Sequence, residues 1–424
     1  MMSQTQILES TNRVAAIPQV SAFPYKLVLA YIVLEFGRPQ EVIPGLAALH
    51  LPGIAIALLA VQILRSGRFS LSDRQSILLS VLLALLVLHV PLVTNTFYAF
   101  NVTWSMTLQL IVYGGIIIFV DSMERIKSLF TVLLCVHVYL ALHALVLHGR
   151  GVGGFLGDEN DLCMTLDMMV PVPFFLALCE KNAVRKFVYV LATGVLLIGI
   201  VATSSRGGFL GLLAVGVYCW IRSPRKVAAL GVIGVLIGAM LIFTPQSYWD
   251  EMSTITKGTE NETGEDRVYQ WEIGWEMFLD NPIIGVGQGN FPFEFRTYEI
   301  KAGYPEGLHG RSRAGRAAHS LYFTLMPELG LVGIYIFVSL LNQSRRELMA
   351  IRRSLNPAGE DVEQEDHDSI RNLTFALEGS FVGFLASSVF ITTLYYPNYW
   401  ILVAVVLALR KVVVGEAPHR VAHH

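Results

Sequence analysis

The sequence is poor in charged residues. Of its 424 residues only 15% are Asp, Glu, Lys or Arg, whereas 54% are hydrophobic. A soluble globular chain usually has about 25% charged and 45–50% apolar residues, so an ordinary soluble enzyme and a disordered chain are both excluded. Basic residues are not in excess either: 31 Lys and Arg against 33 Asp and Glu exclude a basic nucleic-acid-binding protein. The composition indicates an integral membrane protein.

Cysteines and metal-binding patterns are also scarce. The four cysteines all lie in apolar stretches, which predicts neither a disulfide framework nor a zinc site: Cys135, Cys163, Cys179 and Cys219. The sequence has no HExxH, no DxD, no Asp/His cluster at ligand spacing and no P-loop. We therefore expect no metal and no cofactor. A membrane enzyme that handles phosphate in this way would rely on fixed cationic side chains.

Long apolar runs dominate the rest of the chain. A bilayer-spanning helix needs about 20 mostly apolar residues. Twelve segments qualify: 20–36, 43–64, 75–93, 99–120, 126–148, 161–179, 186–203, 207–222, 227–244, 320–341, 373–391 and 393–410. The sequence thus predicts an all-α fold, a polytopic membrane protein with about twelve transmembrane helices.

The distribution of basic residues supports this topology. If the N-terminus is cytoplasmic, the loops alternate so that 21 of the 31 Lys and Arg residues lie inside, in agreement with the positive-inside rule. Both termini are then cytoplasmic. The topology divides the chain into three regions: a nine-helix membrane region over 1–244, a large external loop over 245–319, and C-terminal membrane helices over 320–424 with a cytoplasmic loop over 342–372. We expect the cytoplasmic loop to be a solvated connector and the external loop to be functional.

An amphipathic helix is predicted inside the external loop. Thr263-Gly-Glu-Asp266 has the form of a capping box, and Asp280-Asn-Pro282 ends the helix. Apolar residues recur along one helix face at intervals of three, four and three: Val268, Trp271, Trp275 and Phe278. Because Trp is favoured at the membrane–water boundary, we expect the helix to lie there. Trp271 and Trp275 either anchor it or line a groove for a lipid tail.

A glycine-rich segment comes after the helix. Ile284-Gly-Val-Gly-Gln-Gly-Asn290 has the glycines of a nucleotide-binding loop, but no strand precedes it and Pro292 interrupts the residues after it. A tight turn that lets the backbone approach the membrane or a ligand is the better interpretation.

Two arginines lie close to the predicted outer boundary. Arg206 separates two apolar spans with almost no loop, so its side chain either faces a protein interior, a cavity or an anionic head group, or snorkels to the interface. Arg267 lies in the first turn of the predicted helix, where the helix dipole opposes a cation. It therefore serves either a nearby anion or a salt bridge to an acid of the same loop, such as Glu265 or Asp266.

Three further arginines precede a histidine at the start of a span: Arg311, Arg313, Arg316 and then His319. Arginine is the preferred bidentate partner of phosphate oxygens. An imidazole can take a proton near neutral pH, and neighbouring cations would keep it neutral and basic. His319 is therefore the candidate general base.

Four motifs in this order resemble the O-antigen ligase and polymerase superfamily of bacterial polytopic membrane proteins, and most closely its lipopolysaccharide O-antigen ligases. They are Gly157-Asp-Glu-Asn160, Ser205-Arg206-Gly207, Arg267-x-x-x-Trp271 leading to Asn281-Pro-Ile-Ile-Gly-Val-Gly-Gln-Gly289, and His319-Ser-Leu-Tyr322 followed by Glu328-Leu-Gly330. The resemblance covers most of residues 150–340. The first motif departs from the family, with acids where a Pro-Asn pair is common, and we assign it no catalytic part.

The resemblance implies a metal-independent, inverting glycosyltransferase at the periplasmic face of the bacterial inner membrane. Its donor would be a glycan on undecaprenyl pyrophosphate and its acceptor the lipid A-core oligosaccharide. Arg206, Arg267 and His319 stand where the family's functional arginines and histidine stand, the arginines to bind pyrophosphate and His319 to act in catalysis. Arg311, Arg313 and Arg316 are candidates for further phosphate or acceptor contacts.

Other interpretations remain open at this point. An O-antigen polymerase or a protein O-oligosaccharyltransferase would use the same donor with a different acceptor. A transporter would also explain twelve spans and an arginine near hydrocarbon. Transporters, however, typically show paired, broken helices in two related halves, and the halves of this sequence are unlike.

Overall fold

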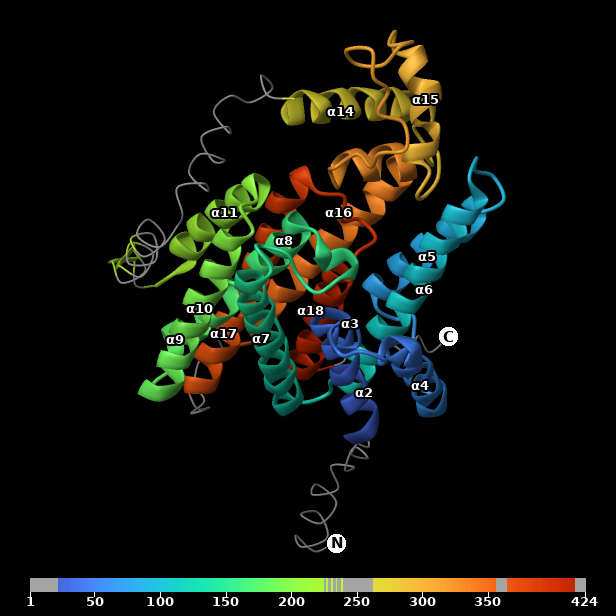
Figure 1. Ribbon diagram of the computed structural model, residues 1–424. Coiled ribbons are helices and arrows are strands. Elements are labelled where there is room, and N and C mark those ends of the chain that lie inside the picture. The colour runs from blue at the N-terminus through green and yellow to red at the C-terminus, as the bar shows by residue number, and fades with distance from the viewer. Residues whose placement is uncertain are drawn as a thin grey trace, which may run out of the picture.

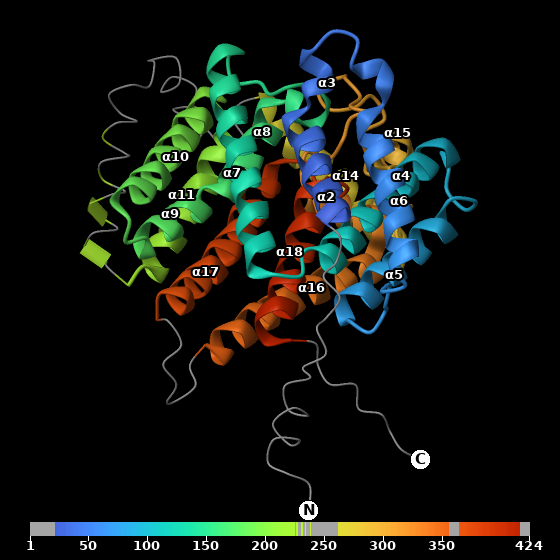
Figure 2. The same cartoon turned by 90° about the horizontal axis from the view of Figure 1, so that it is seen from below.

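The computed structural model describes residues 22–224, 262–355 and 364–415, with a few isolated positions between 226 and 238. Within these residues the chain forms helices and turns without any named strand, so the predicted all-α class is confirmed. Most helices pack side by side as a bundle, seen from two directions in Figures 1 and 2. Two helices, α14 (Glu262–Asp280) and α15 (Phe291–Lys301), lie at one end of the bundle.

The first half of the chain contributes these elements: α2 (Ala22–Ile32), η1 (Val33–Gly37), α3 (Pro39–Val42), η2 (Ala47–Leu49), α4 (Leu51–Ser66), α5 (Arg74–His89), α6 (Thr96–Phe119), α7 (Met123–Val146), η3 (Gly154–Gly157), α8 (Glu159–Met169), α9 (Pro171–Cys179), α10 (Ala183–Ala202) and α11 (Arg206–Arg222). After α14 and α15 come α16 (Tyr322–Ser354), α17 (Gln364–Ser387), η5 (Ser388–Phe390) and α18 (Pro397–Val414).

Eight helical segments among the described residues are long and apolar enough to cross a membrane. They are Ala47–Ser66, Thr96–Phe119, Met123–Val146, Glu159–Cys179, Ala183–Ala202, Tyr322–Ser354, His367–Phe390 and Pro397–Val414. The chain is therefore a multi-pass membrane protein. Eleven of the twelve predicted segments overlap described helices. The other, 227–244, lies outside the described residues apart from isolated positions, so the number of twelve stays a prediction.

The solvated connector predicted over 342–372 is much shorter in the structure. Helix α16 continues to Ser354 and α17 begins at Gln364, so much of this region is helical. The reason is visible in the burial pattern: Ser344, Leu348 and Ile351 are all fully buried, at the spacing of one helix face. Because the segment 342–372 is mostly polar in composition, this narrow buried stripe is not apparent from the sequence.

Helices α8 and α9 lie at the centre of the bundle. In the most apolar part of Glu159–Cys179, which these two helices form, 83% of the residues are buried. Two glycines let α11 approach this centre closely. A Cβ at Gly208 would lie 2.0 Å from the Cys163 Sγ on α8, and one at Gly211 would lie 1.9 Å from the Ser387 Oγ on α17. The start of α11, where Arg206 lies, is thereby fixed next to the start of α8.

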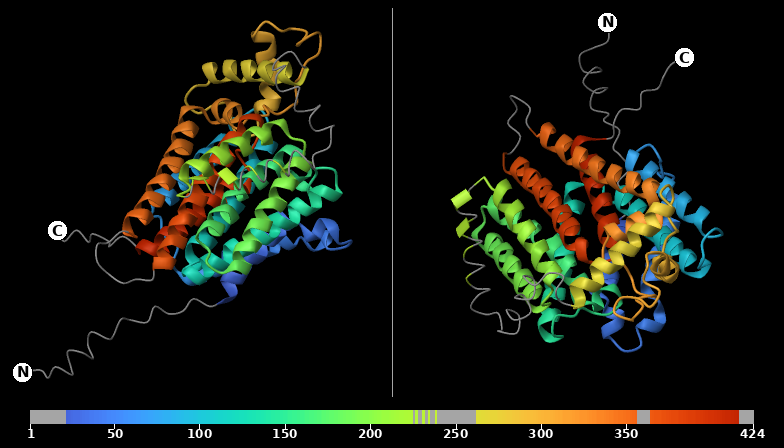
Figure 3. Two further views of the ribbon diagram at one scale, coloured as in Figure 1. Left: turned by 90° about the vertical axis from the view of Figure 1, so that its left-hand side faces the viewer. Right: turned by 90° about the horizontal axis from the view of Figure 1, so that it is seen from above.

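Helix α14 crosses the end of the bundle, as the two views of Figure 3 show. The predicted amphipathic helix is confirmed, and its place at the membrane–water boundary stays a prediction. Tyr269, Ile273 and Met277 are the buried residues and form a small core with α15, whereas Val268 and Trp275 are 46% and 45% exposed. Apolar residues occur on both sides of this helix, and contact with α15 and α16 decides which side is buried.

The glycine-rich segment packs into a break in α16. Gly330 leaves the helical conformation (φ 60°), and the N–H groups of Val286 and Gly287 donate to the carbonyls of Pro327 and Glu328 at 2.8 and 3.0 Å. The predicted tight turn is confirmed. Its backbone approaches α16, and an approach to the membrane or a ligand stays a prediction.

Glu328 joins three parts of the fold. Its buried carboxylate accepts hydrogen bonds from the N–H of Gly289 (2.8 Å), the N–H of Phe291 (3.2 Å) and the hydroxyl of Tyr395 (2.7 Å). A buried carboxylate is tolerated when its oxygens are paired in this way. The contact fixes the segment before α18, and with it the neighbouring Tyr396.

Candidate functional site

A cavity of about 290 Å³ lies where α14 meets the end of the bundle. Four separate parts of the chain line it: the start of α8, the first half of α14, the segment just before α16, and the segment between α17 and α18. Of the predicted site residues, Arg267, Arg316 and His319 are in this lining. The fold thus brings together residues that are up to 238 positions apart in the sequence, from Asp158 to Tyr396.

His319 is held in an unusual backbone conformation. Its φ is 47°, in the left-handed region that a residue with a Cβ rarely adopts. Both neighbours, Ala318 and Ser320, are 1% exposed, and the Ala318 carbonyl accepts a hydrogen bond from Trp271 Nε1 at 3.0 Å. The strained backbone and its buried neighbours leave the imidazole itself accessible in the cavity. Strain of this kind often occurs at functional sites.

The surroundings of His319 favour its neutral form. Desolvation by nearby protein atoms lowers the pKa of the imidazole below its ordinary value, and the positive charges of Arg267 and Arg316 lower it further, while Asp158 acts in the opposite direction. The imidazole is consequently unprotonated at neutral pH. It can accept a proton there.

Arg267 faces the cavity without an ion pair among the described residues. Its guanidinium lies 5.6 Å from the ring centre of Phe390. Burial and the nearby charge of Arg206 lower the pKa of Arg267, and Asp158 raises it. The alternative of a salt bridge to Glu265 or Asp266 is not what the structure has.

Arg206 is the first residue of α11. The preceding Ser205 caps this helix by accepting a hydrogen bond from the Gly208 N–H at 3.0 Å, and its hydroxyl donates to Asn160 Oδ1 at 2.7 Å. These bonds fix the helix start against the start of α8. Arg206 is near enough to Arg267 for the two charges to interact, so the structure places the two predicted pyrophosphate-binding arginines together.

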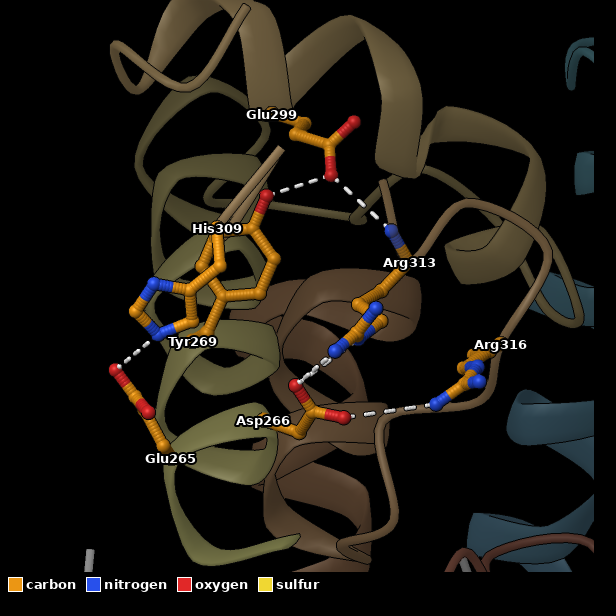
Figure 4. A network of polar contacts seen from close by, with 7 residues as sticks. All are labelled: Glu265, Asp266, Tyr269, Glu299, His309, Arg313 and Arg316. Carbon is orange, nitrogen blue, oxygen red and sulfur yellow. Dashed lines mark hydrogen bonds and ion pairs between the residues drawn. The ribbon is translucent and has the colours of Figure 1, made fainter. Parts of the chain in front are cut away.

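The three arginines before His319 have different surroundings; Arg313 and Arg316 are drawn in Figure 4. Arg313 donates to Asp266 Oδ1 through Nε and Nη2 at 2.9 and 2.7 Å and is 13% exposed. Arg316 lies 3.6 Å from the other oxygen of Asp266, is 57% exposed and lines the cavity. Arg311 is exposed and is not part of the lining. Only Arg316 of the three is therefore available to a molecule in the cavity.

A second carboxylate anchors the same segment to α14 and α15. Glu299 is fully buried and accepts hydrogen bonds from Tyr269, Ser312 and the Arg313 N–H at 2.5, 2.5 and 3.2 Å. Burial would raise the pKa of Glu299, but these hydrogen bonds and one from Arg296 outweigh it, and the pKa is lowered. His309 Nε2 also lies 3.0 Å from Glu265 Oε1 (Figure 4). Together these contacts hold in place the segment of the chain that leads to His319.

The two tryptophans that the sequence predicts to anchor α14 or to line a lipid groove have different surroundings. Trp271 stacks on Phe323, with ring centres 5.1 Å apart and planes 1° apart, and its Nε1 binds the Ala318 carbonyl. It therefore positions His319. Trp275 packs only against Phe278 (5.4 Å) among the ring contacts of the described residues and is 45% exposed. A role in a lipid groove stays a prediction for both.

One wall of the cavity is not identifiable from the sequence. Asp158, Asn160 and Asp161 at the start of α8 face the cavity together with Tyr396. The Tyr396 hydroxyl donates to Asp161 Oδ2 at 2.9 Å. The motif Gly157–Asn160 departs from the family pattern, so the sequence predicts no catalytic part for it. Tyr396 lies next to Pro397, near the start of the last predicted span, and nothing else in the sequence marks it as a site residue.

Comparison with known proteins agrees with this geometry. Residues 191–338 match the family model described as O-antigen ligase. Over 152 residues the chain is 27% identical to the O-antigen ligase of Salmonella typhimurium, an alignment that covers 34% of this chain and 36% of the relative. Over these segments the chain is similar to O-antigen ligases, and both matches support the O-antigen ligase superfamily. The resemblance found in the sequence motifs is thus confirmed.

The family match has definite limits along the chain. Its model covers Arg206, Arg267 and His319, but Asp158 and Tyr396 lie outside it. The chain matches about a third of the length of the Salmonella typhimurium relative. The similarity to O-antigen ligases therefore bears on the cationic side of the cavity and leaves the acidic side to be judged from the structure.

Proposed function

We propose that the protein is an O-antigen ligase: a metal-independent, inverting glycosyltransferase. It moves a glycan from undecaprenyl pyrophosphate to the lipid A-core oligosaccharide at the periplasmic face of the bacterial inner membrane. The similarity to O-antigen ligases supports glycosyl transfer in O-antigen assembly. The observation that carries the finer proposal is the meeting of Arg267 and His319 at one cavity, with Arg206 near enough to Arg267 for the two charges to interact.

The arginines would bind the donor pyrophosphate. Two guanidinium groups held near each other repel, and an anion between them relieves that repulsion. As the bond between the sugar and the pyrophosphate breaks, negative charge grows on the leaving oxygen, and fixed cations in a partly desolvated site stabilise that charge. Arg206 and Arg267 supply these cations, with Arg316 at the rim.

His319 would act on the acceptor. The acceptor hydroxyl oxygen forms a bond to C1 of the donor sugar while the bond from C1 to the phosphate oxygen breaks, and its electron pair leaves with undecaprenyl pyrophosphate. The hydroxyl proton passes to the neutral imidazole of His319. Asp158 is close enough to influence the imidazole charge and would stabilise the imidazolium that forms.

The lipid tail of the donor would enter from the side. Val268, Trp275 and Leu279 are exposed apolar residues of α14, and an apolar groove between this helix and the neighbouring spans would hold the isoprenoid. A photoprobe on the isoprenoid should crosslink to α14. Crosslinks confined to other helices would contradict the groove.

The decisive test is transfer by purified protein with a lipid-pyrophosphate donor and a lipid A-core acceptor. Arg267→Ala should abolish transfer, and Arg267→Lys should restore it poorly, because lysine lacks the planar fork that binds phosphate bidentately. Arg311→Ala is the matched control from the same loop and should keep full activity. Because arginines carry the charge in this proposal, EDTA should leave the wild-type rate unchanged. Full activity of Arg267→Ala would remove this residue from the site.

A deletion strain separates ligase from polymerase. Loss of a ligase leaves lipid-linked polymer accumulated and the lipid A-core bare. Loss of a polymerase leaves a single repeat unit attached. A bare core with accumulated polymer is the expected result.

A further inference from the structure

We propose that one part of the cavity lining is a subsite for the hydroxyl groups of a sugar. It is formed by Asp161, Tyr396, Gln270 and Thr392. This inference rests on the proposed function, because it names the part of the substrate that the acidic side of the same cavity takes. Nothing in the family match bears on it, since three of the four residues lie outside the matched segment.

The charges of the cavity are divided between its sides. Arg267, Arg316 and His319 come from α14 and the segment before α16, where the charge of Asp266 is paired with Arg313 and Arg316, whereas Asp158 and Asp161 come from the start of α8. A pyrophosphate is attracted to the first group and repelled by the second. The acidic side therefore suits a neutral ligand that donates hydrogen bonds.

Two buried polar atoms in the lining lack partners. Gln270 is 2% exposed and its Oε1 has no hydrogen-bond partner among the described residues; the same holds for the buried Thr392 Oγ1. An unpaired buried polar group destabilises a fold, and native structures contain few of them. Both residues line the cavity, and rotation of either side chain toward it would let a ligand there supply the missing partner.

The hydrogen-bonding capacity of this wall matches a sugar. Oε1 of Gln270 only accepts, the Thr392 hydroxyl both donates and accepts, and the Asp161 carboxylate, already bonded by Tyr396, is an acceptor. Sugar hydroxyls donate and accept at once, whereas a fully ionised pyrophosphate has no proton to donate. Phe390 and Ile391 add an apolar surface beside these groups.

The size of the cavity limits what can bind. Small-molecule sites typically measure about 300–1,000 Å³, so about 290 Å³ lies at the lower end of that range. One end of a glycan fits, not a polymer. Two substrate parts offer the same chemistry: the sugar attached to the donor pyrophosphate and the terminal sugar of the acceptor.

The test compares three ligands on the purified full-length chain. They are undecaprenyl pyrophosphate without a glycan, the glycan-bearing donor, and the lipid A-core acceptor. Gln270→Leu and Thr392→Val remove the polar atoms at nearly constant volume. Each should weaken binding of one sugar-bearing ligand about tenfold, as expected for loss of one hydrogen bond, and leave the sugar-free lipid pyrophosphate unchanged.

Two further variants separate binding from folding. Thr392→Ser keeps the hydroxyl and should bind like the wild type. Thr193→Val removes another buried threonine hydroxyl, which donates to the Tyr189 carbonyl within α10 and lies away from the cavity, and should also leave ligand binding unchanged. Equal melting temperatures of Thr392→Val and Thr193→Val would show that any difference in binding is local.

The outcomes are distinct. Weakening confined to the donor assigns the subsite to the donor sugar, and weakening confined to the acceptor assigns it to the acceptor sugar. Unchanged binding of both sugar-bearing ligands, or equal weakening of the sugar-free lipid pyrophosphate, overturns the inference. A wild-type protein that binds sugar-bearing ligands but transfers no glycan would instead contradict the proposed function and leave the subsite standing.

Discussion

His319 shows how a single residue can be held for chemistry. Its backbone is in the left-handed region and both neighbours are buried, so the fold bears the strain while the imidazole stays accessible. Trp271 contributes by binding the Ala318 carbonyl. The position of the imidazole is therefore determined by side chains from another element, α14, and not by the local sequence around His319.

His319→Ala should lose transfer while keeping affinity for the donor. Removing a general base typically slows a reaction by about 10²–10⁴-fold, whereas Arg206 and Arg267 remain to bind pyrophosphate. Donor affinity and the single-turnover rate should be measured on the same protein. Lost donor binding with an unchanged chemical step would make His319 a binding residue and refute its role as base.

Acidification should reduce activity through the titration of His319. Its pKa is lowered by desolvation and then by Arg267 and Arg316, with Asp158 opposing them, so the active neutral form persists below the ordinary pKa of about 6.5 and is lost only at more acidic pH. Arg316→Gln removes one of the cations. The acid limb of the pH–rate profile should then move to higher pH, whatever the maximal rate.

Arg311→Gln serves as the control for this shift. Arg311 belongs to the same loop but does not line the cavity, so its removal should leave the acid limb where it is. Identical profiles for Arg316→Gln and the wild type would show that the group responsible for the limb is not His319.

Some of this residue-scale picture can be predicted from the sequence, and some cannot. A cation near hydrocarbon or at a helix start is costly, so Arg206 and Arg267 are recognisable as candidates. The pairing of Arg313 with Asp266 joins residues 47 positions apart. The spacing of the arginines in the sequence does not show that Arg313 is paired with an acid, whereas Arg316, three residues later, lines the cavity.

At the scale of elements, α14 and α15 form a cap whose stability depends on buried Glu299. Its carboxylate collects hydrogen bonds from Tyr269 on α14 and from Ser312 on the loop that leads to His319. The interaction joins α14, α15 and this loop at the end of the bundle, where Trp271 stacks on Phe323 of α16. We expect the cap to unfold locally before the bundle does.

Glu299→Gln should destabilise this cap by about 1–3 kcal/mol, because charge-assisted bonds are lost and a buried amide replaces a carboxylate. Hydrogen exchange of α14 and α15 measures the effect. The pKa of Glu299 is lowered, so the stabilisation is present above its ordinary pKa of 4.5 and is lost as the pH falls through the lowered value. Glu306→Gln, at an exposed position of the same loop, should leave exchange unchanged. Equal exchange in Glu299→Gln and the wild type would count against this role.

The elements also show where sequence patterns reach their limit. The helical period locates α14 to within a few residues, but it does not say which side is buried, because Val268, Tyr269, Trp271 and Ile273 are apolar on both sides. Periodicity locates a helix. The choice of face depends on which partner covers it, and α15 is a partner that no local pattern reveals.

At the scale of the whole molecule, the cavity exists only because distant segments converge at one end of the bundle. The acidic side comes from α8 in the first half of the chain and the cationic side from α14 and the segment before α16. The spans can be predicted from hydropathy because each is a local property. Their convergence is a property of packing, and Gly208 and Gly211 contribute to it only through the close approach of α11.

The orientation of the molecule in the membrane can be tested along α16. This helix begins at Tyr322, just after His319, is broken at Gly330 and continues to Ser354. At 1.5 Å per residue the part after the break, residues 331–354, is about 35 Å long, which exceeds the roughly 30 Å hydrocarbon core, so the two ends of α16 should lie on opposite sides of the membrane. In a chain with Cys135 and the other three cysteines replaced by serine, Glu306→Cys should react with a membrane-impermeant maleimide in spheroplasts, because the cavity end of the bundle would be periplasmic. Arg345→Cys, exposed on the far part of the same helix, should react only after the membrane is broken. The reverse pattern would place the cavity in the cytoplasm, where a periplasmic transfer of glycan could not occur.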